Sequence, residues 1–286
     1  MLRGIITALI TPFKNQKLDE EGFIQLVDRQ VNSSIDGLLV LGTTGESPTL
    51  SREEKKRLIH LTLETSNGVK PVIVGTGTNC TQKTIDATLE AKDLGAQAAL
   101  IIAPYYNRPT QEGLYRHYTE IANACDFPII VYNHPGRTGV HMQSATLLKI
   151  AEHPQIIGIK ESCNDLSHMQ TLIENRKPGF KVFTSNDEMA YVTYALGGDG
   201  VISVASNLVP EKMCAVSDLA THRKLRPLFE ALTSESNPIP IKAAMALAGL
   251  PAGDPRLPLT PLCPEKEKNL EEVMKKLNLK VQKVYP

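Results

Sequence analysis

The sequence predicts an α/β fold, a (β/α)8 TIM barrel with a C-terminal helical extension. Eight short apolar runs recur along the chain, each bounded by Gly, Pro, Asn or Ser. A longer amphipathic segment follows most of these runs, which is the alternation expected for parallel strands joined by helices. Eight such units in 286 residues favour a closed barrel over a doubly wound open sheet.

Each predicted element can be located along the chain. The expected strands begin at Gly4, Gly37, Pro71, Ala98, Phe127, Gln155, Phe180 and Asp199. The segment after Ser51 is typical of a helix, because Ser51 is a good N-cap and Glu54 completes a capping box. After about Leu219 the pattern becomes helical without strands. We therefore expect a barrel over residues 1–220 and a helical region over residues 221–286.

Charge and composition exclude several classes of protein. The chain has 31 Lys+Arg and 31 Asp+Glu, so it lacks the basic surface that nucleic-acid binding requires. No apolar run approaches the length of a membrane span. The short apolar run near the N-terminus is followed by Pro12 and Lys14 rather than by a cleavage site. We expect a cytoplasmic protein without membrane or nucleic-acid partners.

The sequence offers no motif for a cofactor or a metal. Its five cysteines are scattered and form no C-x-x-C pair, which argues against a disulfide framework or a zinc knuckle. The stretch from Val74 to Cys80 starts like a dinucleotide fingerprint but lacks the third glycine. The seven histidines include no H-E-x-x-H motif. We therefore expect neither a cofactor nor a metal ion.

Polar side chains gather where the predicted strands end. In a barrel, the loops after the strands all open on one face, so these side chains should line a common mouth. The residues at these positions are Thr43, Thr44, Tyr105, Tyr106, Tyr132, Arg137, Lys160 and Ser185.

Lys160 stands out because it ends the nearly all-apolar run "QIIGIK". Lysine is seldom buried, so one interpretation is a strand that reaches solvent, with Lys160 snorkelling outward or pairing with Glu161. The hydroxyls expected from neighbouring strands favour a second interpretation, a reactive amine whose pKa is lowered from about 10.4. We expect Ile157 and Ile159 to supply part of the apolar surroundings.

Six motifs in order suggest a family. They are "GTTGESPTLS", "PYYNRPTQEGLY", "VYNHPGRTG", "IIGIKES", "GGDGVISVASN" and "NPIPIKAAMALAGL". With these motifs the sequence resembles, over nearly its whole length, the dihydrodipicolinate synthase branch of the pyruvate-dependent class I aldolases. The resemblance implies a barrel with a helical extension, usually a homotetramer built as a dimer of dimers. It also implies condensation of pyruvate with L-aspartate 4-semialdehyde to 4-hydroxy-tetrahydrodipicolinate, in diaminopimelate and lysine biosynthesis.

The resemblance assigns roles to individual residues. It implies that Lys160 forms a Schiff base with pyruvate and that Thr43 and Thr44 hold the pyruvate carboxylate. Arg137 would receive the carboxylate of the semialdehyde. Ile202 falls at a further substrate-binding position.

The same resemblance implies a relay of hydroxyl groups. It consists of Thr43, Tyr132 and Tyr106, with Tyr106 reaching in from a neighbouring subunit. A phenol that shuttles protons works best when its pKa of about 10 is lowered. We expect hydrogen bonds to Thr43 and Tyr106 to lower the pKa of Tyr132.

The second-substrate end of the site is less certain from the sequence. Asn186 stands at a substrate-binding position where the family more often has glycine, and His134 and Gly136 vary the loop before Arg137. Alternatives within the enzyme class are N-acetylneuraminate lyase and 2-keto-3-deoxy-sugar-acid aldolases. The guanidinium of Arg137 suits a short aldehyde acid better than a polyhydroxylated chain. A non-catalytic regulatory barrel is a remote alternative.

Feedback control can also be anticipated from the resemblance. Sensitive members of the family bind lysine at a subunit interface through a glutamate and histidines. At the matching positions this chain has Lys83, Arg52 and Lys55. We therefore expect lysine to inhibit weakly or not at all.

Overall fold

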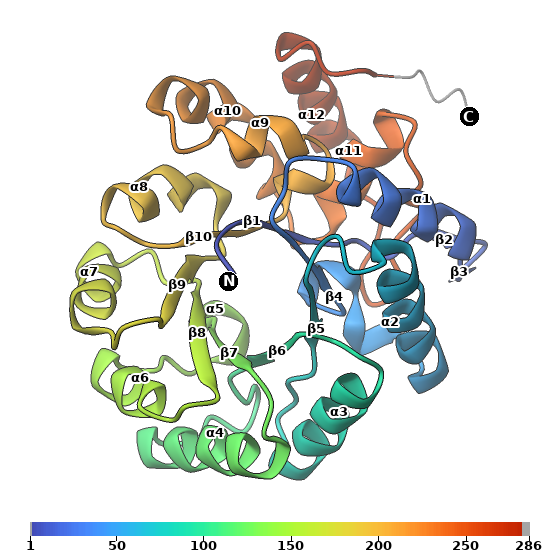
Figure 1. The fold of residues 1–286 in the computed structure, drawn as a ribbon. Coiled ribbons are helices and arrows are strands. Elements are labelled where there is room, and N and C mark those ends of the chain that lie inside the picture. The colour runs from blue at the N-terminus through green and yellow to red at the C-terminus, as the bar shows by residue number, and fades with distance from the viewer. Residues whose placement is uncertain (1, 282–286) are drawn as a thin grey trace.

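The computed structural model describes residues 2–281 and contains the predicted barrel. All eight predicted strands form and run parallel around one axis, and β1 closes the sheet by pairing with both β4 and β10 (Figure 1). The strands are β1 Gly4–Ala8, β4 Gly37–Val40, β5 Val72–Gly75, β6 Ala98–Ile102, β7 Ile129–Asn133, β8 Ile156–Glu161, β9 Lys181–Thr184 and β10 Gly200–Ser203. The predicted fold class is confirmed.

Helices surround the barrel as an outer ring (Figure 1). They are α1 Glu20–Val31, α2 Arg52–Ser66, α3 Thr81–Asp93, α4 Gln111–Cys125, α5 Pro135–Thr138, α6 Ser144–Ala151, α7 Leu166–Asn175, α8 Ala190–Ala195, α9 Pro210–Cys214, α10 Leu219–Leu232, α11 Ile239–Leu247 and α12 Pro264–Lys276. The predicted capping box is present at the start of α2, where Ser51 accepts from the Glu54 amide and the Glu54 side chain accepts from the Ser51 amide. Among the helices of residues 2–281, none combines the length and apolarity needed to cross a membrane.

The alternation of side chains along the strands separates two apolar layers. One layer fills the barrel interior and includes Ile6, Leu39, Ile73, Ile130 and Ile202. The other, larger layer lies between the strands and the helices. A polar side chain that faces inward near the carboxyl end of a strand therefore has the apolar barrel interior on one side and the open mouth of the barrel on the other.

β8 departs from a regular alternation. Its register against β7 shifts by one residue, so that Ile130 pairs with Gly158. Ile157 packs with the barrel interior, whereas Ile159 packs in the outer layer. Of the two isoleucines expected to supply part of the apolar surroundings of Lys160, Ile157 therefore does so from inside the barrel, whereas Ile159 faces the outer layer.

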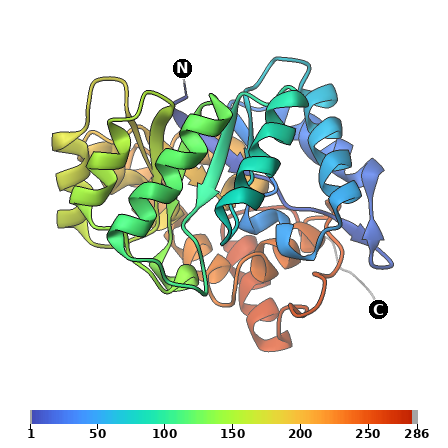
Figure 2. The same cartoon turned by 90° about the horizontal axis from the view of Figure 1, so that it is seen from below.

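The C-terminal helices lie at one end of the barrel. Figure 2 shows α11 and α12 at the end opposite to the N-terminus. The N-terminal segment contains a feature that the sequence did not predict, a small hairpin of β2 (Phe13–Lys14) and β3 (Lys17–Leu18). The first strand ends at Ala8, before the end of the apolar run that begins at Gly4.

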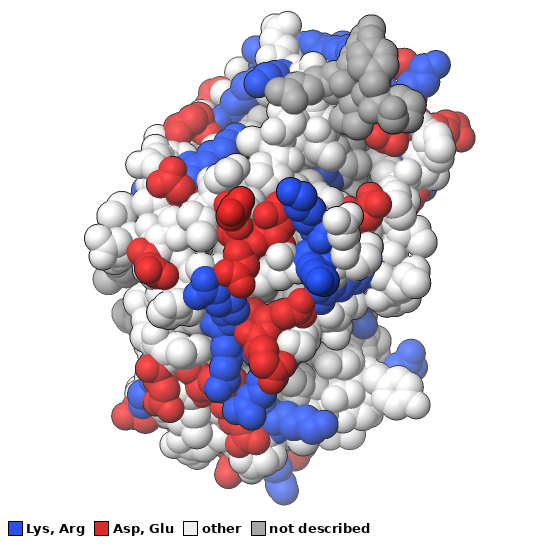
Figure 3. Space-filling model, turned by 90° about the vertical axis from the view of Figure 1, so that its right-hand side faces the viewer, with Lys and Arg blue, Asp and Glu red and all other residues white. Residues whose placement is uncertain are grey.

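Ion pairs connect the first helices on the surface. Arg57 in α2 binds Glu20 in α1 at 2.7 Å, and Arg52 binds Glu90 in α3 at 2.9 Å. Figure 3 shows basic and acidic side chains interleaved on this side of the molecule. Such exposed pairs contribute little individually, so the apolar layers carry most of the fold's stability.

Candidate active site

Lys160 is the next-to-last residue of β8 and lies among buried neighbours. Its register partners are Tyr132 in β7 and Phe183 in β9. Lys160 is 5% exposed, and its Nζ lies 4.3 Å from the centroid of the Tyr132 ring. Burial lowers the pKa of Lys160 to about 7, with Asp187 opposing this shift and Arg137 adding to it. Much of this amine is therefore neutral at neutral pH, which is the nucleophilic form.

Tyr132 is buried beside this amine and behaves differently from the prediction. Burial raises the pKa of Tyr132 to about 12, although Arg137 and hydrogen bonding with Thr43 and Ser185 act in the opposite direction. The expected lowering of this pKa is therefore wrong, because the loss of hydration outweighs the hydrogen bonds. At neutral pH the phenol keeps its proton.

The turn after β4 brings two hydroxyl groups to the mouth of the barrel. Thr43 begins the 3-10 helix η1 (Thr43–Gly45), and Thr44 is buried within it. The hydroxyl of Thr44 accepts a hydrogen bond of 3.0 Å from the side-chain amide of Asn237. A short 3-10 turn leaves backbone N–H groups available beside the hydroxyls, which suits a carboxylate ligand.

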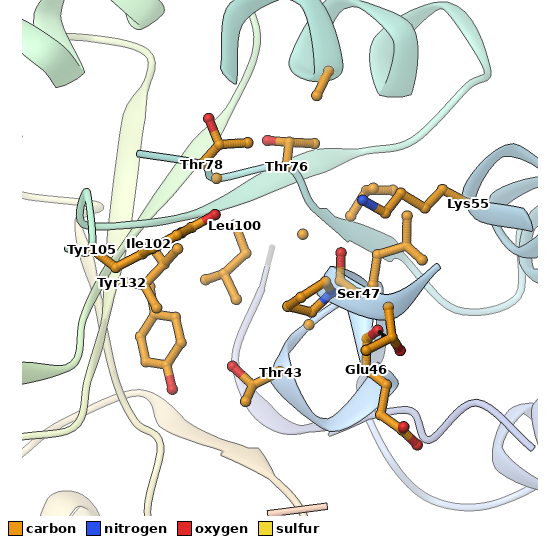
Figure 4. Close-up of a pocket in the computed structure, with 18 of the residues that line it drawn as sticks. Thr43, Glu46, Ser47, Lys55, Thr76, Thr78, Leu100, Ile102, Tyr105 and Tyr132 are labelled. Atoms are coloured by element: carbon orange, nitrogen blue, oxygen red, sulfur yellow. Dashed lines mark hydrogen bonds between the residues drawn. The ribbon is translucent and has the colours of Figure 1, made fainter. Parts of the chain in front are cut away.

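The resemblance assigned catalytic or substrate-binding roles to eight residues, and six of these line one cavity of 790 Å³. They are Thr43, Thr44, Tyr132, Arg137, Lys160 and Asn186. A smaller cavity of 420 Å³ adjoins it and shares Thr43, Tyr132 and Arg137. Figure 4 shows Thr43 and Tyr132 on one side of this smaller cavity, with Lys55, Thr76 and Thr78 farther along its wall.

The exposed rim of the larger cavity carries Arg137. This residue lies in the short helix α5, and its guanidinium donates to the Asn237 carbonyl at 3.0 Å. Asn186 also lines the cavity and donates to the Asn164 side chain at 2.6 Å. His134 stands between Tyr132 and Arg137 in the sequence, and burial lowers its pKa to about 4. The cavity wall therefore carries the guanidinium of Arg137 and neutral hydrogen-bonding groups, together with the carboxyl groups of Asp187, Glu188 and Glu235.

Two predicted site residues do not reach this cavity. Tyr106 is 90% exposed, has a positive φ of 74°, and lines neither of the two cavities described above. Ile202 is fully buried in the barrel interior and is absent from the cavity walls. Direct contact between these side chains and a ligand of the same chain is therefore not supported.

Two residues of the site were missed by sequence reasoning. Asn237 contacts both Thr44 and Arg137, yet it lies in the motif "NPIPIK" far from either in sequence. Asp187 accepts from the Val204 and Ala205 amides at 3.1 and 2.8 Å. Its other carboxylate oxygen is buried and has no hydrogen-bond partner within residues 2–281. No local pattern marks either residue, because their contacts form only in the folded barrel.

A neutral amine, a protonated phenol, two threonine hydroxyls and a guanidinium thus converge on one cavity. Within the part of the chain that the structure describes, no three His, Cys, Asp or Glu residues are grouped as a metal site would require. The arrangement suits covalent catalysis by an amine on a carbonyl compound that carries a carboxylate.

Known proteins are similar to this chain in both sequence and fold. The chain matches the family model described as Dihydrodipicolinate synthetase family over residues 1–277. A 4-hydroxy-tetrahydrodipicolinate synthase of Thermotoga neapolitana is 45% identical, and the match covers 98% of this chain and 100% of the relative. The crystal structure of a dihydrodipicolinate synthase from Thermotoga maritima superposes with a TM-score of 0.95 at 44% identity, covering 98% and 99% of the two chains.

A further crystal structure is of the chloride-inhibited dihydrodipicolinate synthase from Acinetobacter baumannii complexed with pyruvate. It superposes with a TM-score of 0.95 at 40% identity and covers 98% of this chain and 100% of that one. These matches extend over both the barrel and the C-terminal helices. The chain therefore belongs to the dihydrodipicolinate synthetase family.

Proposed function

We propose that this chain condenses pyruvate with L-aspartate 4-semialdehyde to 4-hydroxy-tetrahydrodipicolinate, in the pathway to diaminopimelate and lysine. Relatives named as 4-hydroxy-tetrahydrodipicolinate synthases at 41–45% identity support this activity. The observation that carries the proposal is the amine of Lys160, buried at the end of β8 with its pKa lowered to about 7.

The chemistry follows from a neutral amine in that position. The Lys160 nitrogen attacks the keto carbon of pyruvate, and loss of water gives an iminium. The iminium draws electrons from the pyruvate methyl group, so a methyl proton leaves and an enamine forms. The enamine carbon then attacks the aldehyde carbon, and the aldehyde oxygen takes up a proton. The amino group contributed by the semialdehyde then adds to the iminium carbon and displaces the Lys160 amine, which closes the ring of the product and returns Lys160 to its free form.

The carboxylates of the two substrates have separate anchors in this proposal. The hydroxyl and N–H groups of Thr43 and Thr44 hold the pyruvate carboxylate close to Lys160. The guanidinium of Arg137 receives the carboxylate of the semialdehyde at the rim, where Asn186 contributes to the pocket wall. A guanidinium binds a carboxylate through two parallel hydrogen bonds, which fixes the orientation of the aldehyde.

Tyr132 acts as the proton carrier between the intermediates. Because its pKa is raised to about 12, its phenol enters the cycle protonated and donates first. Thr43 accepts and passes on the proton as the neighbouring member of the relay. Tyr132 therefore works by exchanging one proton for another rather than as a free phenolate.

Borohydride trapping tests the covalent step. Reduction in the presence of pyruvate should convert the imine to a secondary amine and leave a mass increment on the peptide that contains Lys160. Labelling of another lysine, or of none, would refute the proposed mechanism.

Substrate preference separates the proposed function from the alternatives. Purified protein should turn over pyruvate with aspartate semialdehyde in a coupled assay. Under the same conditions, cleavage of N-acetylneuraminate and of 2-keto-3-deoxygluconate should be slower by at least about 100-fold, since Arg137 matches a short acid and not a polyhydroxylated chain. Equal or faster cleavage of either sugar acid would reverse the assignment.

We also propose that the enzyme is a cytoplasmic homotetramer, a dimer of dimers, in which Tyr106 completes the site of a neighbouring subunit. The support is the placement of Tyr106, which is largely exposed and lines neither of the two cavities of its own chain described above. Mixing inactive Tyr106→Phe and Lys160→Ala subunits should restore activity, because each mixed dimer then contains one intact site. No recovery after verified subunit exchange would count against the shared site.

A further inference from the structure

Glu46 closes the turn that carries Thr43 and Thr44, and its backbone is unusual. It has φ 53° and ψ 35°, the left-handed region. A residue with a side chain rarely adopts this conformation, because its Cβ crowds the backbone. Such a conformation persists where the surrounding contacts hold it in place. The contacts of the Glu46 side chain therefore bear directly on the shape of the turn.

The Glu46 carboxylate is held by the C-terminal region. One oxygen accepts from the Lys242 ammonium at 2.7 Å, and both side chains are almost completely buried, at 0% and 1% exposure. The other oxygen accepts from the Arg256 amide at 2.9 Å. Lys242 lies in α11, 196 positions later in the sequence. A helix outside the barrel thus supplies the charge that fixes an active-site turn.

Lys242 also contacts Thr11, which binds the residue before Glu46 in the same turn. Its remaining hydrogens point to the carbonyls of Thr11 and Asp254, at 3.1 and 3.3 Å. The hydroxyl of Thr11 in turn donates to the Gly45 carbonyl at 2.7 Å. All three donors of the ammonium are used, and two of the three contacts lead to the C-terminal end of the Thr43–Gly45 turn, to Glu46 directly and to Gly45 through Thr11.

We infer that the Glu46–Lys242 pair is a positioning device that sets the affinity for pyruvate, by keeping the Thr43–Gly45 turn in its carboxylate-binding shape. The inference rests on the proposed function. Neither side chain lines the larger cavity, so both act through Thr43 and Thr44 rather than on the substrate. A buried pair that served stability alone would not need to lie on this turn.

Lys242→Met tests the inference, because it keeps the length of the side chain and removes the charge. Half-saturating pyruvate should rise by about tenfold or more, both in borohydride trapping and in KM, since a charged buried hydrogen bond to the turn is lost. The KM for the semialdehyde should stay within about twofold. A melting temperature that falls while half-saturating pyruvate stays within twofold of wild type would overturn the inference.

Lys181→Met is a matched control at the other end of the barrel. Lys181 starts β9 and binds Asp199 at 2.8 Å with 18% of its side chain exposed. The control should lower the melting temperature without changing half-saturating pyruvate. An equal loss of pyruvate affinity in both variants would attribute the effect to general destabilisation and overturn the inference.

The double variant Glu46→Gln/Lys242→Met covers the case in which the single variant does not fold. It leaves no unpaired buried charge, so it should fold, and neutral hydrogen bonds then hold the turn less firmly. Half-saturating pyruvate should still be several-fold above wild type, and a wild-type value would refute the inference. Failure of the proposed function is distinguishable, because wild-type protein would then show no pyruvate adduct at all.

Discussion

Lys160 in the barrel and Lys242 in α11 are both buried, and burial lowers the pKa of both, yet they differ in the polar groups that surround them. Their apolar surroundings are alike, because each ammonium lies 4.3 Å from the centroid of an aromatic ring, Tyr132 for Lys160 and Phe13 for Lys242. Their polar surroundings differ. Lys242 binds a carboxylate at 2.7 Å and two carbonyls. Within residues 2–281, the Lys160 ammonium has no comparable side-chain partner.

This difference shows that burial alone does not make a lysine reactive. At Lys242 the carboxylate of Glu46 opposes the lowering of the pKa by burial, because it stabilises the charged form of the lysine. A lysine that is buried without such a partner loses its proton more easily and becomes a nucleophile. The counter-ion, rather than the depth of burial, separates the reactive residue from the structural one.

Replacing each lysine by methionine gives the largest contrast. Lys160→Met should abolish the pyruvate adduct and reduce turnover by at least about 10³-fold, because the nucleophile is gone. Lys242→Met should leave the adduct on Lys160. Mass spectrometry after borohydride treatment distinguishes the two, and any label on Lys242 would contradict the comparison.

The same two variants should change stability in opposite directions. Lys242→Met should lower the free energy of unfolding by about 3–5 kcal/mol, since Glu46 is left buried and unpaired. Lys160→Met should raise the free energy of unfolding at pH 7 by up to about 4 kcal/mol, because it removes a group whose pKa is lowered on folding and each pKa unit corresponds to about 1.36 kcal/mol. Denaturant unfolding measures both, and a loss of stability in Lys160→Met would contradict the cost assigned to its burial.

The sign of that second effect depends on pH. Between pH 7 and about 10.5 the unfolded chain binds a proton at Lys160 that the folded chain has lost. The free energy of unfolding of the wild type should therefore rise with pH across this window, and Lys160→Met should lack that contribution. Unfolding at pH 7 and pH 9 checks the difference in slope, provided that the protein remains soluble.

Tyr132→Phe keeps the ring over Lys160 and removes only the hydroxyl. Turnover should fall by about 10²-fold or more, because the proton carrier is lost. The pyruvate adduct should still form, with an unchanged pH dependence of trapping. A shifted dependence would mean that the hydroxyl, and not the burial by the ring, sets the pKa of Lys160.

The pH dependence of trapping reports the pKa of Lys160 directly. Trapping should be half-maximal near pH 7 and fall by about tenfold per unit well below it, following the neutral amine. Arg137→Ala should move the midpoint upward, because Arg137 lowers this pKa, and Asp187→Asn should move it downward. A midpoint near 10 in the wild type would show that the pKa of Lys160 is not lowered, and it would contradict the proposed role of its burial.

Adding free lysine should change the reaction rate less than any of these substitutions. The carboxylates on the wall of the smaller cavity are Glu46, which binds Lys242, and Glu90, which binds Arg52 and Lys56. Neither is left unpaired to hold a ligand ammonium. Millimolar lysine should change initial rates by less than about twofold, and half-inhibition at sub-millimolar lysine would show that another site exists.

The sequence was most informative where a pattern is local. Strand positions followed from apolar runs, and the place of Lys160 followed from the end of one such run. The pKa of Tyr132 could not be predicted, because it depends on how completely the barrel buries the phenol. Asn237 and Lys242 were equally hidden, since their partners lie 193 and 196 positions away. Such contacts are products of the closed barrel and leave no periodic signal.

The one-residue shift between β7 and β8 decides which chemistry the barrel contains. With uniform pairing, Tyr132 would stand beside Ile159, and the amine of Lys160 would face the helices. The extra residue at Ile157 turns the rest of the strand over, so that the amine points inward. A strand shortened by that single isoleucine would pair regularly and still place Lys160 opposite Tyr132, so the shift is what lets the full-length strand keep the amine inside the barrel. The direction of the proposed nucleophile is thus set by the register of β8 against β7 as much as by the identity of the residue.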